Sequence, residues 1–411
     1  MKTLIKNIGA LVTPVGNTAK AGEEQSKLSV LQDAYVCIED GRITRIGTGL
    51  PDDAETASEV IDACGKLVTP GLVDSHTHLV FGGWREHELA LKRRGVPYLE
   101  ILAQGGGILS TVQMTRAATE QELAEKAETV LREMLALGVT TCEAKSGYGL
   151  DVDTELKQLR VIRELQERQP VELVPTYLGA HAVPKEYKED REAYMQLMEG
   201  LLPQIAEEGL AEFCDVFCET GVFTPEESKQ ILLAAQRLGL RSKIHSDEID
   251  AIGGTEVAGE LGAISAEHLI AINHSGIEAL AKSGTVAVLL PATSFYLNKP
   301  YAPARTMVQA GVPVALASDF NPGSCPGFNL QLVMNLGCWK SGLSPEEVLT
   351  AVTLNAAAAC GRADRIGSVE EGKQADLVIW DAPNLEYIFY RFGQNLANTV
   401  IKKGKIQYTK G

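Results

Sequence analysis

Two histidines separated by one residue, His76 and His78, are the first side chains in this 411-residue chain whose spacing suggests joint chemistry. They end the largely apolar stretch 67–78, which is typical of a buried strand. Residues i and i+2 of a strand point to the same side, so both imidazoles are expected to face one way. Two such imidazoles can supply two ligands to one divalent metal if the rest of the chain brings the others. The alternative is a pair of partly buried histidines that only form hydrogen bonds.

The elements that must position these histidines repeat a pattern of strand and then helix. Helical periodicity covers 119–137, 151–167 and 225–238, and Thr224 and Ser344 are expected N-caps, each before a proline. Eight strands are expected near residues 71–78, 138–145, 171–180, 213–219, 241–246, 263–268, 285–290 and 313–319. Eight βα units predict an α/β fold, a closed parallel (β/α)8 barrel of the TIM type.

Both ends of the chain contain short segments with strand character. They lie near 4–8, 34–39 and 42–46, and again near 372–380 and 399–406. Neither end can bury a sheet by itself, so we expect the two ends to combine into one small β-sandwich. The predicted organisation is therefore a sandwich formed by residues 1–65 and 361–411, with the barrel formed by residues 66–360.

Composition limits the classes of partner. The formal net charge of -16 disfavours binding to nucleic acid or to an anionic membrane surface, whereas a small anionic substrate needs only a local cation. The N-terminus lacks the apolar core of a signal peptide, and no apolar run approaches membrane-spanning length, so a cytoplasmic location is expected. The eight cysteines form no CxxC pair, which favours reduced thiols over a disulfide framework.

Reactive residues of such a barrel lie at the C-terminal ends of its strands. Any one histidine there could be an ordinary core residue, but a whole set at one rim indicates a site. Two histidines, a third histidine and one aspartate suit Zn²⁺ or Fe²⁺, with a position left for water. The residues expected at this rim are His76, His78, His181, His245, His268 and Asp319.

This pattern resembles the amidohydrolase superfamily of metal-dependent hydrolases, and longer segments resemble its imidazolonepropionase family. The likeness spans nearly the whole chain. It implies hydrolysis of 4-imidazolone-5-propanoate to N-formimidoyl-L-glutamate in histidine degradation, and a homodimer. The segments that carry it are residues 81–85, 105–108, 143–149, 178–181, 245–248 and 317–324.

The resemblance implies one metal ion, Zn²⁺ or Fe²⁺/Fe³⁺. Some superfamily members bridge two metals with a carboxylated lysine on strand four, but residues 213–219 contain no lysine, which predicts a single ion. Lys145 lies on strand two, where we expect a structural ion pair with a neighbouring carboxylate. The implied metal ligands are His76, His78, His245 and Asp319.

Opening a cyclic amide requires a nucleophilic hydroxide near neutral pH, and a metal can lower the pKa of water from 15.7 to about 7. Asp319 can accept the proton of that water, and His268 can polarise the carbonyl or shuttle a proton. The resemblance also implies a role at the ring for Glu248, as acceptor of a ring N–H or as a base. The sequence does not choose the general base among these three, and Glu248 could instead be a solvated loop acid.

Recognition of a propionate tail needs a cation, because burying an unpaired carboxylate is costly. Arg85 is the candidate, through a bidentate pair, unless it is a surface arginine. The resemblance implies that Tyr148 and His181 bind substrate; otherwise they are a loop aromatic and a core histidine. The segment after Asp319 is expected to line the product side, or only to form a sharp exit from strand eight; its candidates are Asn321, Gly323 and Ser324.

Two other functions fit parts of this pattern. A related enzyme could deaminate an aromatic base or open a different cyclic amide, because the superfamily shares its barrel. A scaffold or binding protein could keep the barrel after losing activity, but such a protein would usually lack part of the metal set. Here all four expected ligands and His268 are present.

Overall fold

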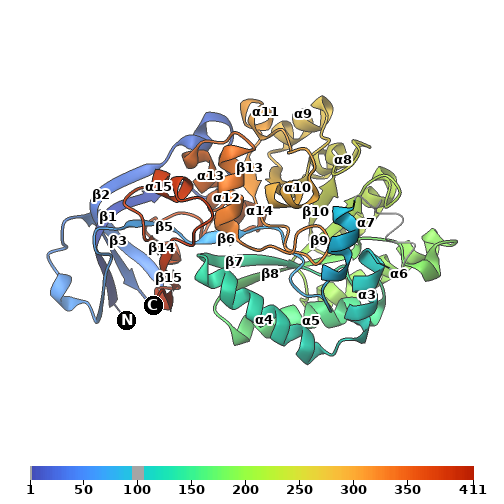
Figure 1. Cartoon of the computed structure of the whole chain (residues 1–411), viewed down its shortest axis with the longest axis horizontal. Helices are drawn as coiled ribbons and strands as arrows, with labels where there is room; N and C mark the ends of the chain where they lie inside the picture. The colour runs from blue at the N-terminus through green and yellow to red at the C-terminus, as the bar shows by residue number, and fades with distance from the viewer. Residues whose placement is uncertain (1, 95–105) are drawn as a thin grey trace.

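A computed structural model describes residues 2–94 and 106–411. Gly105, in one of the family-like segments, lies outside these ranges. Figure 1 shows a sheet built from both ends of the chain at the left and a barrel surrounded by helices at the right. Among the helices of the described ranges, none combines the length and apolar character needed to span a bilayer.

The barrel strands are all parallel and neighbour one another in chain order. The ring closes where Thr77 bridges to Phe320, since Asp319 N donates to His76 O at 3.1 Å and His78 N donates to Phe320 O at 2.8 Å. The predicted (β/α)8 barrel is therefore confirmed. Its strands are β6 (Leu72–Asp74), β7 (Val139–Lys145), β8 (Glu172–Ala180), β9 (Phe213–Cys218), β10 (Arg241–Ser246), β11 (Ser265–His268), β12 (Val286–Leu289) and β13 (Val314–Leu316).

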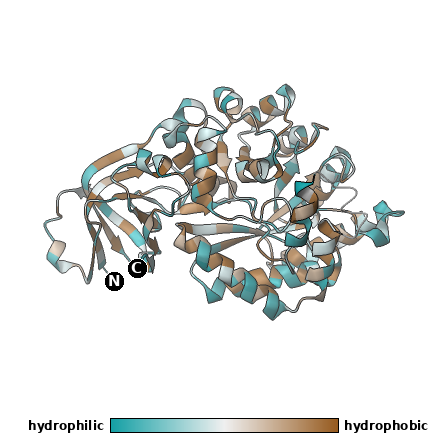
Figure 2. Cartoon of the chain, viewed as in Figure 1, coloured by the Kyte–Doolittle hydropathy of each residue, from teal (hydrophilic) through white to brown (hydrophobic). Residues whose placement is uncertain are grey.

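Helices cover the outside of the barrel, with apolar residues toward the strands and polar residues outward (Figure 2). Thr224 and Ser344 each form a capping box, as expected from the proline that follows each of them. The helices are α1 (Leu89–Arg93), α3 (Ile108–Ala117), α4 (Glu120–Ala136), α5 (Val152–Arg168), α6 (Arg191–Glu207), α7 (Pro225–Arg237), α8 (Gly254–Leu261), α9 (His274–Ser283), α10 (Pro291–Leu297), α11 (Ala304–Gln309), α12 (Leu330–Trp339), α13 (Pro345–Ala351), α14 (Leu354–Ala359) and α15 (Leu385–Tyr390).

The expected single strand over 67–78 is wrong. Gly71 divides it into β5 (Leu67–Pro70), which belongs to the terminal sheet, and β6, which begins the barrel. A side chain at Gly71 would meet Thr140, since a Cβ there would lie 2.3 Å from Thr140 Oγ1. The chain thus passes from one sheet to the other at a glycine, and both histidines lie beyond the end of β6 rather than within a strand.

The two ends of the chain combine, as predicted, but their strands form one continuous eight-stranded sheet beside the barrel where a small sandwich was expected. Its order is β16-β15-β14-β5-β1-β2-β3, with β4 paired to β1, and Ile5, Ile8 and Leu377 lie in its apolar core. The other strands of this sheet are β1 (Lys2–Thr13), β2 (Ser29–Glu39), β3 (Arg42–Thr48), β4 (Glu59–Asp62), β14 (Leu377–Trp380), β15 (Ala397–Lys402) and β16 (Lys405–Thr409).

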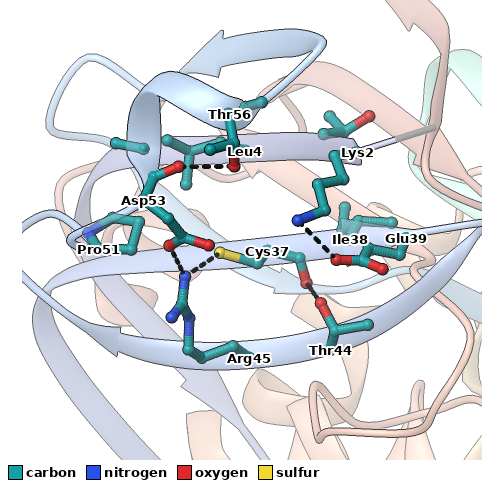
Figure 3. A pocket seen from close by; sticks show the side chains of 13 residues that line it. Lys2, Leu4, Cys37, Ile38, Glu39, Thr44, Arg45, Pro51, Asp53 and Thr56 are labelled. Atoms are coloured by element: carbon teal, nitrogen blue, oxygen red, sulfur yellow. Dashed lines mark hydrogen bonds and ion pairs between the residues drawn. The ribbon is translucent and has the colours of Figure 1, made fainter.

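This sheet carries a hollow of about 230 Å³ on its surface, shown in Figure 3. Its two labelled cations already have partners, because Arg45 pairs with Asp53 and Lys2 Nζ lies 3.5 Å from Glu39 Oε1. The residues that could do chemistry together lie instead at the mouth of the barrel.

Candidate active site

Five histidines converge at the C-terminal mouth of the barrel, where strands β6, β8, β10 and β11 end. The ring centroid of His76 lies 4.6 Å from that of His245 and 5.5 Å from that of His268. His78 stacks on His181 at 4.9 Å with an interplanar angle of 14°. The structure thus brings together the histidines that the sequence assigned to one rim.

Two groups of side chains in this cluster have the spacing of metal ligands, with ligand atoms within 4.8 Å of one another. The first contains His76, His78 and Asp319; the second contains His76, His245 and His268. Nε2 of His76 lies 3.4 Å from Asp319 Oδ1, and Nε2 of His78 lies 3.7 Å from the same oxygen.

The buried nitrogens of the cluster fit a bound metal ion. Within residues 2–94 and 106–411, Nε2 of His76 and Nε2 of His245 are buried and make no hydrogen bond. A buried polar atom without a partner is costly, and imidazole nitrogens with an adjacent carboxylate are ligands that Zn²⁺ and Fe²⁺ accept. The donor set present here therefore fits a bound metal ion.

A layer of buried charges lies directly beneath the histidines. Nδ1 of His76 lies 2.5 Å from Glu267 Oε2, and Nδ1 of His245 lies 2.8 Å from Asp215 Oδ2. Such carboxylates orient an imidazole so that its other nitrogen faces the metal. Sequence reasoning missed both acids. Strand alternation offers a signal for Asp215, which lies two residues before Phe217, whose ring also packs against His245.

Lys145 belongs to this layer. Its Nζ lies 3.0 Å from Glu143 Oε1, 2.8 Å from Asp215 Oδ2 and 2.9 Å from Glu267 Oε2. The expected structural ion pair of Lys145 is confirmed, and it extends to three carboxylates. Lys243 joins the layer through Glu143 and Glu267.

The pKa values of the histidines in this cluster shift in different directions. Burial lowers the pKa of His76, but the carboxylates of Glu267 and Asp319 together outweigh it and raise that pKa to about 9. Burial and the neighbouring histidines hold the pKa of His78 well below its ordinary value. Burial also lowers the pKa of His268, to about 3. A neutral imidazole is the form that can bind a metal or accept a proton.

Two residues of the cluster have left-handed backbones, with φ of 75° at His268 and 55° at Asp319. Such a conformation costs a non-glycine residue roughly 1–3 kcal/mol and persists only where the surroundings hold it. At His268 it ends the strand alternation, so that Glu267 contacts the lysines below while His268 contacts the histidines above. Asp319 is held by Thr293, whose Oγ1 donates to its Oδ2 at 2.6 Å.

Glu248 lies beside His268, with its Oε2 3.6 Å from Nδ1 of the imidazole. Its side chain is four-fifths buried, so the solvated-acid alternative is wrong. Burial, and next the negative charge of Asp319, raises the pKa of Glu248 to about 8. A carboxyl group in this state can donate or accept a proton near neutral pH.

Arg85 is buried and is not a surface arginine. Its Nε and Nη2 donate to Glu88 at 3.0 and 2.9 Å. Its Nη1 packs against Gly323, where a Cβ would lie 2.3 Å from that nitrogen. Glu88 was not predicted, although its spacing of three residues from Arg85 is a common one for ion pairs.

Lys126, on α4, fixes the loop that carries Arg85. Its ammonium lies 3.6 Å from the ring centroid of Phe81 and 4.2 Å from that of Trp84. It also donates to the carbonyl oxygens of Phe81 and Gly83. A cation held by two rings and two carbonyls restrains the backbone of this loop.

Tyr148 and His181 pack against each other and against the ring of His78. The ring of Tyr148 lies 5.3 Å from that of His181 and 5.6 Å from that of His78, and Tyr148 is buried. Nδ1 of His181 lies 2.9 Å from Gly147 O, and because a carbonyl can only accept, Nδ1 carries the hydrogen. Nε2 of His181 is then an acceptor.

The segment after Asp319 is tied together by its own side chains. Asn321 Nδ2 donates to Asp319 Oδ1 at 3.0 Å and to Ser324 Oγ at 2.8 Å, while Asn321 Oδ1 accepts from the backbone N–H groups of Gly323 and Ser324. This arrangement forms a tight exit from β13 that holds Asp319. Gly323 contacts Arg85, which places the exit beside the expected tail-binding cation.

Comparison with known proteins decides the family. A model of the amidohydrolase family matches residues 67–407. The chain belongs to the amidohydrolase family. Its relatives include proteins named imidazolonepropionase from Alkaliphilus metalliredigens (strain QYMF), 52% identical over 99% of this chain and 98% of the relative, and from Bacillus cereus (strain AH187), 54% identical over 100% and 98%. The resemblance to imidazolonepropionases is thus confirmed.

Solved structures of this amidohydrolase fold are more distant in sequence. The atrazine chlorohydrolase from Arthrobacter aurescens TC1 complexed with zinc has a TM-score of 0.74 at 18% identity, covering 99% of this chain and 95% of that one. An adenosine deaminase from Xanthomonas campestris with bound zinc has a TM-score of 0.70 at 20% identity, covering 99% and 93%. These likenesses support the fold alone.

Proposed function

We propose that this amidohydrolase is an imidazolonepropionase, which hydrolyses 4-imidazolone-5-propanoate to N-formimidoyl-L-glutamate. The observation that carries the proposal is the position of Arg85, a buried cation packed on Gly323, four residues after Asp319. A buried guanidinium packed on the segment that follows Asp319 fits a small ring with an anionic tail. The relatives that share more than half of the sequence support the same activity.

His76, His78, His245 and Asp319 would hold the metal in this proposal. When bound, the metal lowers the pKa of a water molecule and so supplies a nucleophile near neutral pH. Glu267 and Asp215 keep the hydrogens of His76 and His245 on Nδ1, which leaves each Nε2 free to coordinate.

The reaction needs two proton transfers, and different residues are available for each. Attack by water on the lactam carbonyl requires removal of a proton, and release of the ring nitrogen requires delivery of one. Asp319 can take the first, while His268 and Glu248, 3.6 Å apart, can pass a proton between them toward the ring. The pKa of Glu248, raised to about 8, allows it to work in either direction.

Arg85 would bind the propionate carboxylate. Glu88 fixes the guanidinium by accepting from Nε and Nη2, and Nη1 lies outside this pair, so it could still donate to the substrate. Tyr148 and His181, whose rings both pack against His78, would contact the imidazolone ring of the substrate. Asn321, Gly323 and Ser324 would shape the product side through the tight exit they form. Binding of one metal, as Zn²⁺ or iron, assembly as a homodimer and a cytoplasmic location remain predictions.

Purified protein incubated separately with 4-imidazolone-5-propanoate, guanine and dihydroorotate tests the proposal against other reactions of the same fold. We expect turnover of the first, with loss of the imidazolone absorbance and formation of N-formimidoyl-L-glutamate, and none of the others. Turnover of guanine or dihydroorotate alone would instead favour the deaminase or the other cyclic amidase, and no turnover of any would favour the scaffold.

A further inference from the structure

The ammonium of Lys145 lies at the centre of the buried charge layer. Glu143, Asp215 and Glu267 surround it from three strands, β7, β9 and β11, at 2.8 to 3.0 Å. All four side chains are 0% exposed. The cation is therefore completely enclosed by carboxylates.

The same carboxylates have metal-ligand spacing. His76, Glu143 and Glu267 form one such group, and Asp215, His245 and Glu267 form another, with the ligand atoms of each group within 4.8 Å. Among the described residues, Glu143 Oε2 and Asp215 Oδ1 are buried without a hydrogen-bond partner. Acceptor oxygens thus remain at this place beyond those that bind the lysine.

The charge of the layer fits a divalent ion in place of the lysine. Three carboxylates face two ammonium groups, those of Lys145 and Lys243, so one negative charge is left over for the histidines above. Removing the Lys145 ammonium would leave two buried negative charges for which the layer itself holds no cation, which is unfavourable. One divalent cation would neutralise both, and carboxylate oxygens are ligands for Zn²⁺ and Mn²⁺.

We propose that the Lys145 ammonium is the resident cation of a second metal-binding site, and that it limits the protein to one metal ion. This inference rests on one part of the proposed function, namely that a first metal ion binds to the histidines above this layer. By filling the lower site, Lys145 keeps Glu267 and Asp215 in place beside Nδ1 of His76 and Nδ1 of His245.

Metal stoichiometry of the wild type, Lys145→Ala and Lys243→Ala tests this inference without relying on turnover. Lys243→Ala is the matched control because it removes the same charge from the same layer. Lys243 contacts Glu143 and Glu267 at 3.0 and 3.3 Å. Asp215 is paired with Lys145 instead, so this variant keeps the Lys145 ammonium among the three carboxylates. Each protein is stripped of metal, dialysed against Zn²⁺ and analysed by mass spectrometry, and anomalous diffraction at the zinc edge locates the ions.

We expect one ion per chain in the wild type and in Lys243→Ala, and two in Lys145→Ala, the second among Glu143, Asp215 and Glu267. One ion in Lys145→Ala, or a second ion among these carboxylates in either of the other proteins, would overturn the inference. Wild-type protein that binds one ion but does not hydrolyse the imidazolone would refute the proposed function while leaving this inference intact.

Loss of a buried cation can also impair folding, so the same variants are compared for thermal unfolding with and without Zn²⁺. If Lys145→Ala does not accumulate, Lys145→Ser, which leaves similar space, replaces it. We expect Zn²⁺ to raise the Tm of the variant more than that of the wild type. A rise in the Lys145 variant that is no larger than that of the wild type would contradict a second site, and the wild-type stoichiometry remains a test that needs no variant.

Discussion

Glu267 Oε2 lies 2.5 Å from Nδ1 of His76 and 2.9 Å from the ammonium of Lys145. One carboxylate thus links a proposed metal ligand to the charge layer beneath it. Glu267→Gln should weaken metal binding about 10- to 100-fold, because a neutral amide no longer increases the basicity of the imidazole. Competition with a chelator of known affinity measures this. Glu278→Gln, at an exposed position on α9, is the control and should bind metal normally.

Glu248 is expected to take part in proton transfer. Glu248→Gln keeps the size of the side chain but cannot exchange a proton, so kcat should fall by about 10²- to 10⁴-fold. Steady-state kinetics on 4-imidazolone-5-propanoate measures it, with Asp250→Asn as a control on the same loop. A kcat within twofold of the wild type would remove Glu248 from proton transfer and leave it a role in binding the ring.

Lys126 should affect substrate affinity through the loop that carries Arg85. Lys126→Met keeps an apolar stem against Phe81 and Trp84 but loses the ammonium, and we expect KM to rise about tenfold with a smaller change in kcat. Lys126→Arg should restore part of the affinity, and Lys282→Met, on the exposed face of α9, should change neither constant. An unchanged KM in Lys126→Met would show that this cation does not position Arg85.

Glu172 joins the barrel to the C-terminal part of the chain and should make stability depend on pH. It binds Arg362 at 2.9 Å and Lys402 at 3.5 Å, and pairs with Arg365. Burial raises its pKa, but Lys402 and the two arginines outweigh burial and lower it below the ordinary value of 4.5. Its stabilisation is therefore fully present above pH 4.5 and is lost as the pH falls through the lowered pKa.

Glu172→Gln should accordingly destabilise the protein at pH 7 by about 3 kcal/mol, as expected for breaking a buried ion pair. Urea unfolding of the wild type and the variant at pH 7 and at pH 3.5 measures the difference, which should shrink at the lower pH. Glu164→Gln, which removes an exposed pair with Arg168, should cost less than about 1 kcal/mol. A difference independent of pH would contradict the assignment.

The sequence was sufficient for the barrel because each strand is a short apolar run followed by a helix with clear caps, as at Thr224 and Ser344. It was insufficient at 67–78, where the apolar run is continuous although Gly71 sends its two halves into different sheets. A hydrophobic pattern indicates that a residue is buried, but it does not indicate which of two sheets buries it. The same limit applies to β1, which runs from Lys2 to Thr13 through a bulge and is longer than expected.

The cluster of histidines could be predicted because histidine is scarce in this chain and strand ends meet at one rim. The charge layer could not, since Asp215, Glu267 and Lys243 look like ordinary polar residues until closure of the barrel places them inside it. The bond between Arg85 and Glu88 was also hidden, because the sequence showed a cation without showing what holds it.

The central claim is that one metal ion, bound by His76, His78, His245 and Asp319, is required to open the imidazolone ring. Turnover of 4-imidazolone-5-propanoate by one preparation, assayed as purified, after chelation and after stoichiometric Zn²⁺ or Fe²⁺ is restored, with metal content determined on each sample, tests it most directly. We predict that activity falls in proportion to the metal removed and returns with one ion per chain. Full activity in metal-free protein would contradict the account.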